Sequence, residues 1–398
     1  MTTTQERSKT PKLLIHAALV VALGIMGDSL MYSLLPLEAG DLGIPLTLVG
    51  LLLSANRLIR LVSNTWAGLA FERWGPRLPF VCAAILALIT TSLYGTGWGF
   101  VVFFLARVGW GIAWSAFRQG GYQAVWAAPE NIKGRLMGIF WGIVRVGSAV
   151  SVVLGGFFYD QFSYTAAVGA VAILTALSIP AALAVRWPKT QFVPKEERTT
   201  ALEGLKLALK TAPRRWILTV GFMDTLFEGM LVSTLSLYLF NRLGTRIEDS
   251  LFGIGTLAGT LIAVRYISNI LFSPVLGSIS DKVGQAGMLI ILSVISLGGI
   301  SGLVSLNGTW MVTCLIPVFM SGAGIFATMN AASCELGEQT ERPHLFVGAF
   351  STAIDAGAAV SPLLAFSIAE IFGFETLYLF AVSLLVIACV RFWQTMKV

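Results

Sequence analysis

Long apolar segments alternate with short polar connections along the whole chain. A helix needs about 20 residues to cross a bilayer core of about 30 Å, and most of these segments reach that length. Their apolar residues run continuously instead of alternating, which favours helices over the strands of a membrane barrel. We predict twelve membrane-spanning helices, near residues 12–37, 45–70, 78–96, 98–127, 135–159, 163–186, 215–240, 250–276, 286–306, 309–333, 344–369 and 374–394.

The composition agrees with a protein that lies mostly in lipid. Hydrophobic residues make up 56% of the chain, charged residues make up 12%, and the mean hydropathy is +0.79. A globular domain has roughly a quarter of its residues charged. The expected fold class is an all-α integral membrane protein, and its even number of helices puts both termini on one side.

The distribution of Lys and Arg predicts which side that is. Of the 27 Lys and Arg residues, 19 lie in the termini or in connections on the same side of the membrane as the termini. Six lie inside predicted spans, and only Arg242 and Arg246 lie in connections on the other side. Cytoplasmic loops are enriched in Lys and Arg. We therefore expect both termini in the cytoplasm, in a plasma membrane of the bacterial inner-membrane type. The net charge of +6 then reflects topology and not nucleic-acid binding.

Neither a cleavable signal peptide nor a cofactor is expected. Residues 1–11 are polar, and the apolar run after them is too long for the core of a signal peptide. The four cysteines and two histidines lack the spacing of a metal site. No Gly-x-x-x-x-Gly-Lys phosphate loop or nucleophile–base pair is visible, so an enzyme is not expected and energy should come from an ion gradient.

Two segments of the chain occur twice, half a molecule apart. GLAFERWG begins at Gly68 and GSISDKVG begins at Gly277, an offset of 209 residues, and both read Gly, three residues, acid, base, one residue, Gly. GSAVSVVLGG begins at Gly147 and GAAVSPLLA begins at Gly357, an offset of 210. Two independent matches at nearly one offset predict an internal duplication, which is a recurring plan of transporters.

On these motifs the chain resembles the major facilitator superfamily, and most closely its twelve-span drug–proton antiporter branch. The resemblance implies two pseudo-symmetric six-helix bundles, residues 1–186 and 215–398, joined by a cytoplasmic linker at 187–214. A second family motif, Arg followed four residues later by Gly, starts here at Arg107. Many drug–proton antiporters carry the string Gly-x-x-x-Gly-Pro-x-x-Gly-Gly in span 5. This chain differs from that string in having Ser151 and Val152 at the central Gly-Pro.

The resemblance also implies a gating role for the repeated loops. In the family they hold the two halves together on the cytoplasmic side, and the first glycine of each loop allows a tight approach of helices. The residues concerned are Gly68, Glu72, Arg73, Gly75 and Arg77 in the first copy and Gly277, Asp281, Lys282 and Gly284 in the second.

Ten charged residues lie inside predicted spans, where each costs several kcal/mol unless it faces a cavity or a partner. In the family, spans 1, 4, 7 and 10 line the cavity. We expect proton coupling from Asp28 first, then from Asp224 or Glu228, and then from Asp355. A carboxyl group beside a guanidinium in a low-dielectric cavity can alternate between protonated and ionised forms. The other candidates are Tyr32, Arg107, Trp110, Trp114, Arg118, Trp141 and Arg145 for the substrate cavity, and Arg57, Arg60, Arg265 and Asn269 for the interface between helices or halves.

Three functions remain open at this point. The leading hypothesis is a proton-coupled exporter of amphipathic small molecules that acts as a monomer by alternating access. The second is a carrier of organic anions, because six Arg and four acids lie inside the spans. The third is a non-transporting membrane sensor or lipid-handling scaffold. For Asp355, a local ion pair with Arg57 or Arg60 is favoured over a coupling role.

Overall fold

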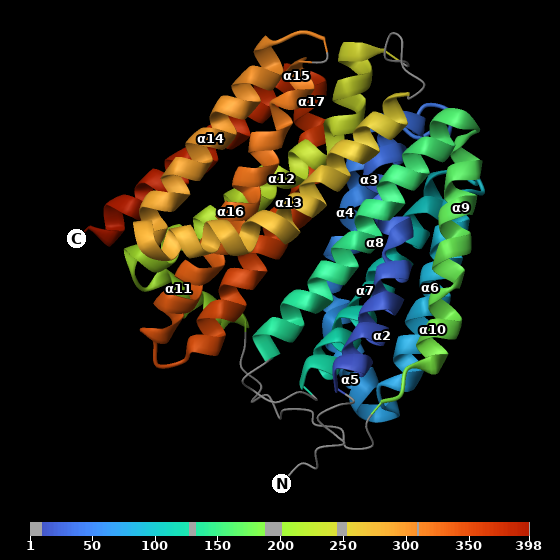
Figure 1. Ribbon diagram of the computed structural model, residues 1–398, viewed down its shortest axis with the longest axis horizontal. Coiled ribbons are helices and arrows are strands. Elements are labelled where there is room, and N and C mark those ends of the chain that lie inside the picture. The colour runs from blue at the N-terminus through green and yellow to red at the C-terminus, as the bar shows by residue number, and fades with distance from the viewer. Residues whose placement is uncertain (1–9, 127–132, 188–200, 245–252, 309, 398) are drawn as a thin grey trace. The chain divides into compact units, whose positions relative to one another are not determined.

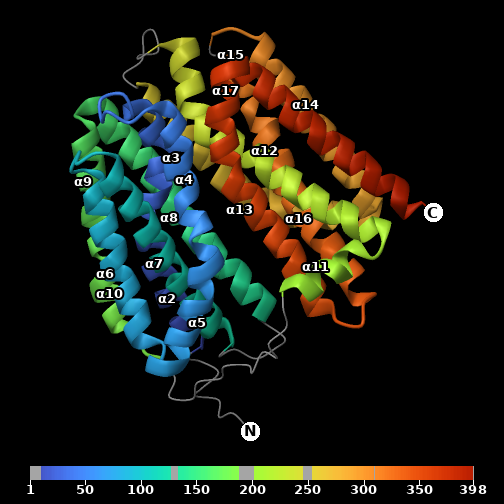
Figure 2. The same cartoon turned by 180° about the vertical axis from the view of Figure 1, so that it is seen from behind.

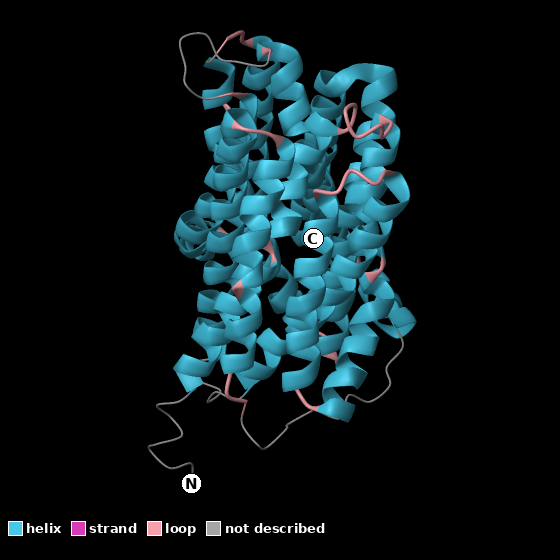
Figure 3. Cartoon of the chain, turned by 90° about the vertical axis from the view of Figure 1, so that its right-hand side faces the viewer, coloured by secondary structure: helices cyan, strands magenta, loops and turns pink. Residues whose placement is uncertain are grey.

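The computed structural model describes residues 10–126, 133–187, 201–244, 253–308 and 310–397, and the regular elements in this part of the chain are helices (Figure 3). Eleven helical stretches of it are long and apolar enough to cross a membrane. One of them, Leu345–Met396, is 52 residues long and is broken at Gly373, where φ is 80°. The two parts on either side of this break correspond to predicted spans 11 and 12.

The helices group into two compact units. Unit 1 comprises residues 1–195 with 244–263, and unit 2 comprises residues 196–243 with 264–398. This grouping differs from the two predicted bundles at 244–263, because the first residues of α13 (Ile254–Val283) pack in unit 1. The bundle boundaries stay a prediction, and residues 188–200 of the predicted linker lie outside the described residues.

Unit 1 contains nine further helices, and several predicted spans consist of two of them in series. Short irregularities at Ile25, Ile59 and Leu177, which all keep helical φ and ψ, divide predicted spans 1, 2 and 6. Figure 1 shows α2 and α3 running along α8. The helices are α2 (Thr10–Gly24), α3 (Met26–Glu38), α4 (Leu46–Leu58), α5 (Arg60–Trp74), α6 (Arg77–Tyr94), α7 (Phe100–Trp126), α8 (Lys133–Gln161), α9 (Tyr164–Ala176) and α10 (Ser178–Ala184).

Unit 2 is built around the contact between its first and last long helices. Figure 2 shows α12 lying against α17, and α14 and α16 pack on the same group. Besides the rest of α13, its helices are α11 (Ala201–Leu209), α12 (Ala212–Leu243), α14 (Gln285–Ser305), α15 (Trp310–Thr313), α16 (Leu315–Glu338) and α17 (Pro343–Met396).

A glycine contact recurs in the two units. Gly147 of α8 lies so close to α2 that a Cβ there would meet the carbonyl oxygen of Ala22. Gly357 of α17 lies in the same way against the carbonyl oxygen of Phe222 on α12. Small residues allow such close approach of membrane helices. The duplicated segments of the sequence therefore make the same kind of contact in both units.

The repeated loops also share a backbone conformation. Gly75 has φ 73° at the end of α5, and Gly284 has φ 93° immediately before α14. These left-handed values are readily adopted only by glycine, which explains the last residue of the motif. The structure shows no close approach at the first glycine: a Cβ at Gly68 would meet no atom within 4 Å, and one at Gly277 would meet only Ala327 Cβ at 3.7 Å. Within its own unit neither glycine is closely approached by a neighbouring helix, and the tight approach of the two halves expected at these loops stays a prediction.

Candidate functional site

A buried ion pair lies at the centre of unit 1. Asp28 is in the first turn of α3, directly after the irregularity at Ile25. Nη1 of Arg107 on α7 pairs with Asp28 Oδ1 at 2.5 Å, and Asn56 Nδ2 on α4 donates to the same oxygen at 2.7 Å. Removing one partner of a buried pair leaves an uncompensated charge and costs about 3–5 kcal/mol. Three helices are therefore fixed to one another at this carboxylate.

The guanidinium of Arg107 has no exposed surface. Its Nε donates to the carbonyl oxygen of Leu52 at 3.0 Å, and its Nη2 donates to that of Leu53 at 3.3 Å. The ring centroid of Tyr32 lies 5.5 Å from the guanidinium carbon. Through these donors Arg107 joins α7 to α3 and α4 inside unit 1.

The three tryptophans expected in the cavity form one aromatic group in unit 1. The rings of Trp110 and Trp114 stack with centroids 5.5 Å apart, and those of Trp114 and Trp141 are 6.0 Å apart. Trp110 is fully buried and donates through Nε1 to the carbonyl oxygen of Gly24 at 3.3 Å. The guanidinium of Arg60 lies 5.5 Å from Trp110 and 5.3 Å from Trp114. Trp110 therefore has no exposed surface with which to line a cavity, whereas Trp141 is only half-buried.

Unit 2 holds a second cluster of charges. Asp224 and Glu228 lie one helical turn apart on α12, and Asp224 is only 4% exposed. Arg265 on α13 donates through Nε to Oε1 of Glu228 at 2.6 Å. Asp224 lies within electrostatic reach of both of these residues. Asn269 donates to the carbonyl oxygen of Arg265 at 3.0 Å, one turn further along α13. Two carboxyl groups thus lie near one guanidinium, and the hydrogen bond of Arg265 goes to Glu228.

The two clusters occupy equivalent places in the duplicated sequence. An offset of 200 residues relates Asp28 to Glu228, as it relates the contact residues Ala22 and Phe222. The motif offset of 209 relates Asn56 to Arg265. In each unit a donor on the second span therefore bonds to an acid on the first span.

Of the remaining candidates, Arg57 lies beside the cluster of unit 1. Arg57 lies with its guanidinium carbon 5.4 Å from the ring centroid of Tyr32. Arg118 on α7 and Arg145 on α8 are half-buried, and Asp355 on α17 is exposed. The predicted pairing of Asp355 with Arg57 or Arg60 would join residues of different units and stays a prediction. In the repeated loops, the structure leaves the acids and bases exposed: Glu72, Arg73, Arg77, Asp281 and Lys282.

Sequence reasoning missed two residues that make specific contacts. Asn56 could have been found from the offset of 209 that relates it to Arg265. Asp160 lies one residue beyond predicted span 135–159, so a count of charges inside the spans misses it. Its carboxylate accepts hydrogen bonds from the amides of Gly255 at 3.0 Å and Thr256 at 2.7 Å, and from the Thr256 hydroxyl at 2.5 Å. Asp160 thereby caps the N-terminus of α13.

Comparison with known proteins agrees with this organisation. The model of the Major Facilitator Superfamily matches residues 17–332 and 217–397. The uncharacterized MFS-type transporter MJ1560 of Methanocaldococcus jannaschii is 22% identical over 371 residues, which are 90% of this chain and 91% of the relative. The multidrug resistance protein MdtG of Dickeya zeae is 22% identical over 356 residues, which are 87% of this chain and 84% of that protein.

The fold is similar to that of solved transporters. A crystal structure of a mutant of the nucleoside transporter NupG superposes with a TM-score of 0.79 and 14% identity, covering 97% of this chain and 100% of that chain. Between them, the two family matches extend from α2 to α17. This chain belongs to the major facilitator superfamily: it is a multi-pass membrane protein that transports a small molecule, and it is not an enzyme.

Proposed function

We propose that the chain is a proton-coupled exporter of amphipathic small molecules that works by alternating access. The name of MdtG, which is similar to most of the chain, refers to multidrug resistance, and this favours export of drug-like compounds. The excess of Lys and Arg in the predicted cytoplasmic connections supports cytoplasmic termini and a site in a plasma membrane of the bacterial inner-membrane type. The two units each carry their own charged cluster, so a monomer suffices for this mechanism.

The observation that carries the proposal is that Asp224 and Glu228 lie together near Arg265. When both acids are ionised, these three side chains together carry one more negative than positive charge. An uncompensated charge is costly at a buried site, and such a group instead takes up a proton. Asp224 is the more buried of the two acids, and the Arg265 hydrogen bond goes to Glu228. We assign the transported proton to this cluster and specifically to Asp224.

This assignment changes the order of the acids expected from the sequence. The Asp28 carboxylate is held by Arg107 and Asn56, and Arg107 is itself held by two backbone carbonyls. A proton on Asp28 would therefore leave the buried Arg107 without its counter-charge. We infer that the pair of Asp28 and Arg107 maintains the fold of unit 1 and that unit 2 carries the proton.

The anion-carrier alternative is weakened by the same geometry. Two of the six arginines inside predicted spans, Arg107 and Arg265, are already neutralised by Asp28 and Glu228. A substrate anion would have to compete with these carboxylates. A lipophilic cation, in contrast, would be attracted to the cluster of Asp224 and Glu228 when it has released its proton.

A transport panel in proteoliposomes tests the proposal. The purified chain is reconstituted, a pH gradient is imposed, and accumulation is followed for ethidium, for an aromatic sulfonate of similar size and for a neutral aromatic compound. We expect gradient-driven accumulation of ethidium that disappears when the gradient is collapsed. Accumulation of the sulfonate alone would support the anion carrier, and binding without flux of any compound would support the sensor.

A further inference from the structure

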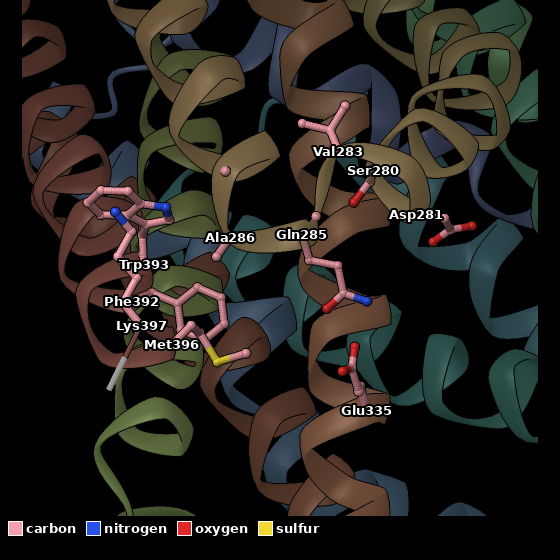
Figure 4. Close-up of a pocket in the computed structure, with 12 residues that line it drawn as sticks. Ser280, Asp281, Val283, Gln285, Ala286, Glu335, Phe392, Trp393, Met396 and Lys397 are labelled. Atoms are coloured by element: carbon pink, nitrogen blue, oxygen red, sulfur yellow. The ribbon is translucent and has the colours of Figure 1, made fainter.

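A pocket of about 580 Å³ lies at the turn between α13 and α14, away from the charged clusters. The ends of α16 and α17 complete it, and all its lining residues belong to unit 2 (Figure 4). Pockets of roughly 300–1,000 Å³ hold drug-sized organic molecules. The chemistry of the lining indicates what kind of molecule this pocket takes.

One wall of the pocket already binds an ammonium group. Nζ of Lys397 lies 3.4 Å from the ring centroid of Trp393. Tryptophan is the aromatic side chain that attracts cations most strongly. Both residues are near the end of α17 and lie on the same side of the pocket in Figure 4. The chain's own ammonium therefore occupies the place that a cationic ligand would take.

The opposite side of the pocket carries two carboxylates. Asp281 on α13 and Glu335 on α16 are both exposed, and Figure 4 shows them across from Trp393. The structure gives neither acid an ion pair within the part of the chain that it describes. With Lys397 as the third charged group of the lining, the pocket has an excess of negative charge.

A buried hydroxyl in the lining supplies an independent indication of a ligand. Ser280 is fully buried, and its Oγ has no hydrogen-bond partner among the described residues. It lies beside Asp281, and in Figure 4 its oxygen is turned towards the side of the pocket where Gln285 lies. Buried hydroxyl groups are nearly always hydrogen-bonded. An N–H donor of a ligand would provide the missing partner.

We infer that this pocket is a binding site for an organic ammonium ion with an apolar or aromatic part. The ammonium lies between Trp393 and the carboxylates of Asp281 and Glu335, in place of Lys397. Phe392 and Met396 provide the apolar wall for the rest of the ligand. The inference rests on the lining of this pocket alone and is independent of the proton site proposed at Asp224.

An anion is the alternative occupant. The N-terminus of α14 lines the pocket without a side-chain cap, and a helix N-terminus together with Lys397 attracts negative groups. The two carboxylates oppose this. The two occupants predict opposite effects of removing Lys397, because its ammonium competes with a cation and assists an anion.

The test uses the methyl group of Met396 as a reporter inside the pocket. The full chain is labelled with ¹³C at the methionine methyl groups, purified in detergent and titrated with benzylammonium or with benzenesulfonate. The Met396 signal is assigned by its loss in Met396→Leu. We expect saturable shifts of this signal with the ammonium compound and none with the sulfonate.

Three variants and two matched controls then test whether the ammonium compound binds in this pocket. Trp393→Leu should weaken ammonium binding about fivefold or more, and Glu335→Gln should weaken it about threefold. Lys397→Ala should strengthen it about threefold. Trp310→Leu and Glu338→Gln, which remove an exposed tryptophan and an exposed acid outside the pocket, should leave the binding curve unchanged.

The other methionine signals show whether each variant keeps its fold. If Trp393→Leu unfolds, the opposite effects of Glu335→Gln and Lys397→Ala still test the site. The inference is overturned if the ammonium compound does not shift Met396. It is also overturned if the sulfonate binds and Lys397→Ala abolishes that binding.

Discussion

Arg265 on α13 donates through Nε to a carboxylate oxygen of Glu228 on α12 at 2.6 Å. The equivalent bond in unit 1 joins Asn56 to Asp28 at 2.7 Å. In unit 1 the positively charged partner of the acid is on a different helix: Arg107 of α7 pairs with Asp28. The cluster of unit 1 thus pairs one acid with one arginine, whereas the cluster of unit 2 places two acids near one arginine. This difference in charge balance is the reason for placing the proton in unit 2.

Loss of Arg265 should destabilise unit 2 through Glu228. A hydrogen bond to a charged group contributes about 1.5–3 kcal/mol, so we expect Arg265→Gln to lower the unfolding temperature of the purified protein. Adding Glu228→Gln should restore part of the loss, because the carboxylate that bonded to Arg265 is then gone. Arg391→Gln, at an exposed position, serves as the control. A double variant no more stable than Arg265→Gln would contradict the pairing.

Breaking the ion pair of Asp28 and Arg107 in unit 1 should destabilise the protein more than the loss of Arg265 does. Arg107→Leu leaves the Asp28 carboxylate buried without its cation, which costs about 3–5 kcal/mol. We expect little folded protein in the membrane by fluorescence-detected size-exclusion chromatography. Asp28→Leu combined with Arg107→Leu should recover folded protein. If Arg107→Leu alone folds as well as the wild type, the pair does not maintain unit 1.

The two contact glycines should be equally sensitive to a small side chain. Gly147→Ala and Gly357→Ala each place a methyl group against a backbone carbonyl, and overpacking of this kind costs about 1–3 kcal/mol. Gly142→Ala on α8 and Gly348→Ala on α17 are matched controls, because a Cβ at either position meets no atom within 4 Å. Thermal unfolding of the four variants measures the difference. Equal stability of the contact and control variants would argue against the repeated contact.

Asp160 should contribute as a helix cap. Replacing a capping Asp by Ala costs about 0.5–2 kcal/mol, and we expect Asp160→Ala to speed hydrogen exchange of the amides of Gly255 and Thr256. Asp160→Asn retains an oxygen acceptor and should have a smaller effect. Exchange at the beginning of α14, which Asp160 does not contact, provides an internal reference. No difference between Ala and Asn would mean that the cap contributes nothing.

The sequence predicted the apolar spans well because the length of an apolar run is a local property. It also located the repeated glycines, since Gly75 and Gly284 satisfy a local backbone requirement. It did not predict the short irregularities at Ile25 and Ile59, because neither side chain breaks a helix.

Roles that depend on distant contacts were harder to predict. Asn56 acts on a residue 28 positions away, and Asp160 acts on one 95 positions away. Trp110 was expected in the substrate cavity, but it is fully buried and bonds to the carbonyl oxygen of Gly24. The pairing of Arg265 with Glu228 likewise depends on how α12 and α13 pack together.

The central claim is that Asp224 carries the transported proton, and proton movement coupled to substrate tests it most directly. Proteoliposomes containing a trapped pH indicator are loaded with ethidium under a pH gradient, and proton flux and ethidium accumulation are recorded together. We predict that Asp224→Asn loses both substrate-coupled proton flux and uphill accumulation, yet still exchanges ethidium down its gradient. Uphill accumulation and proton flux at wild-type levels in Asp224→Asn would contradict the account.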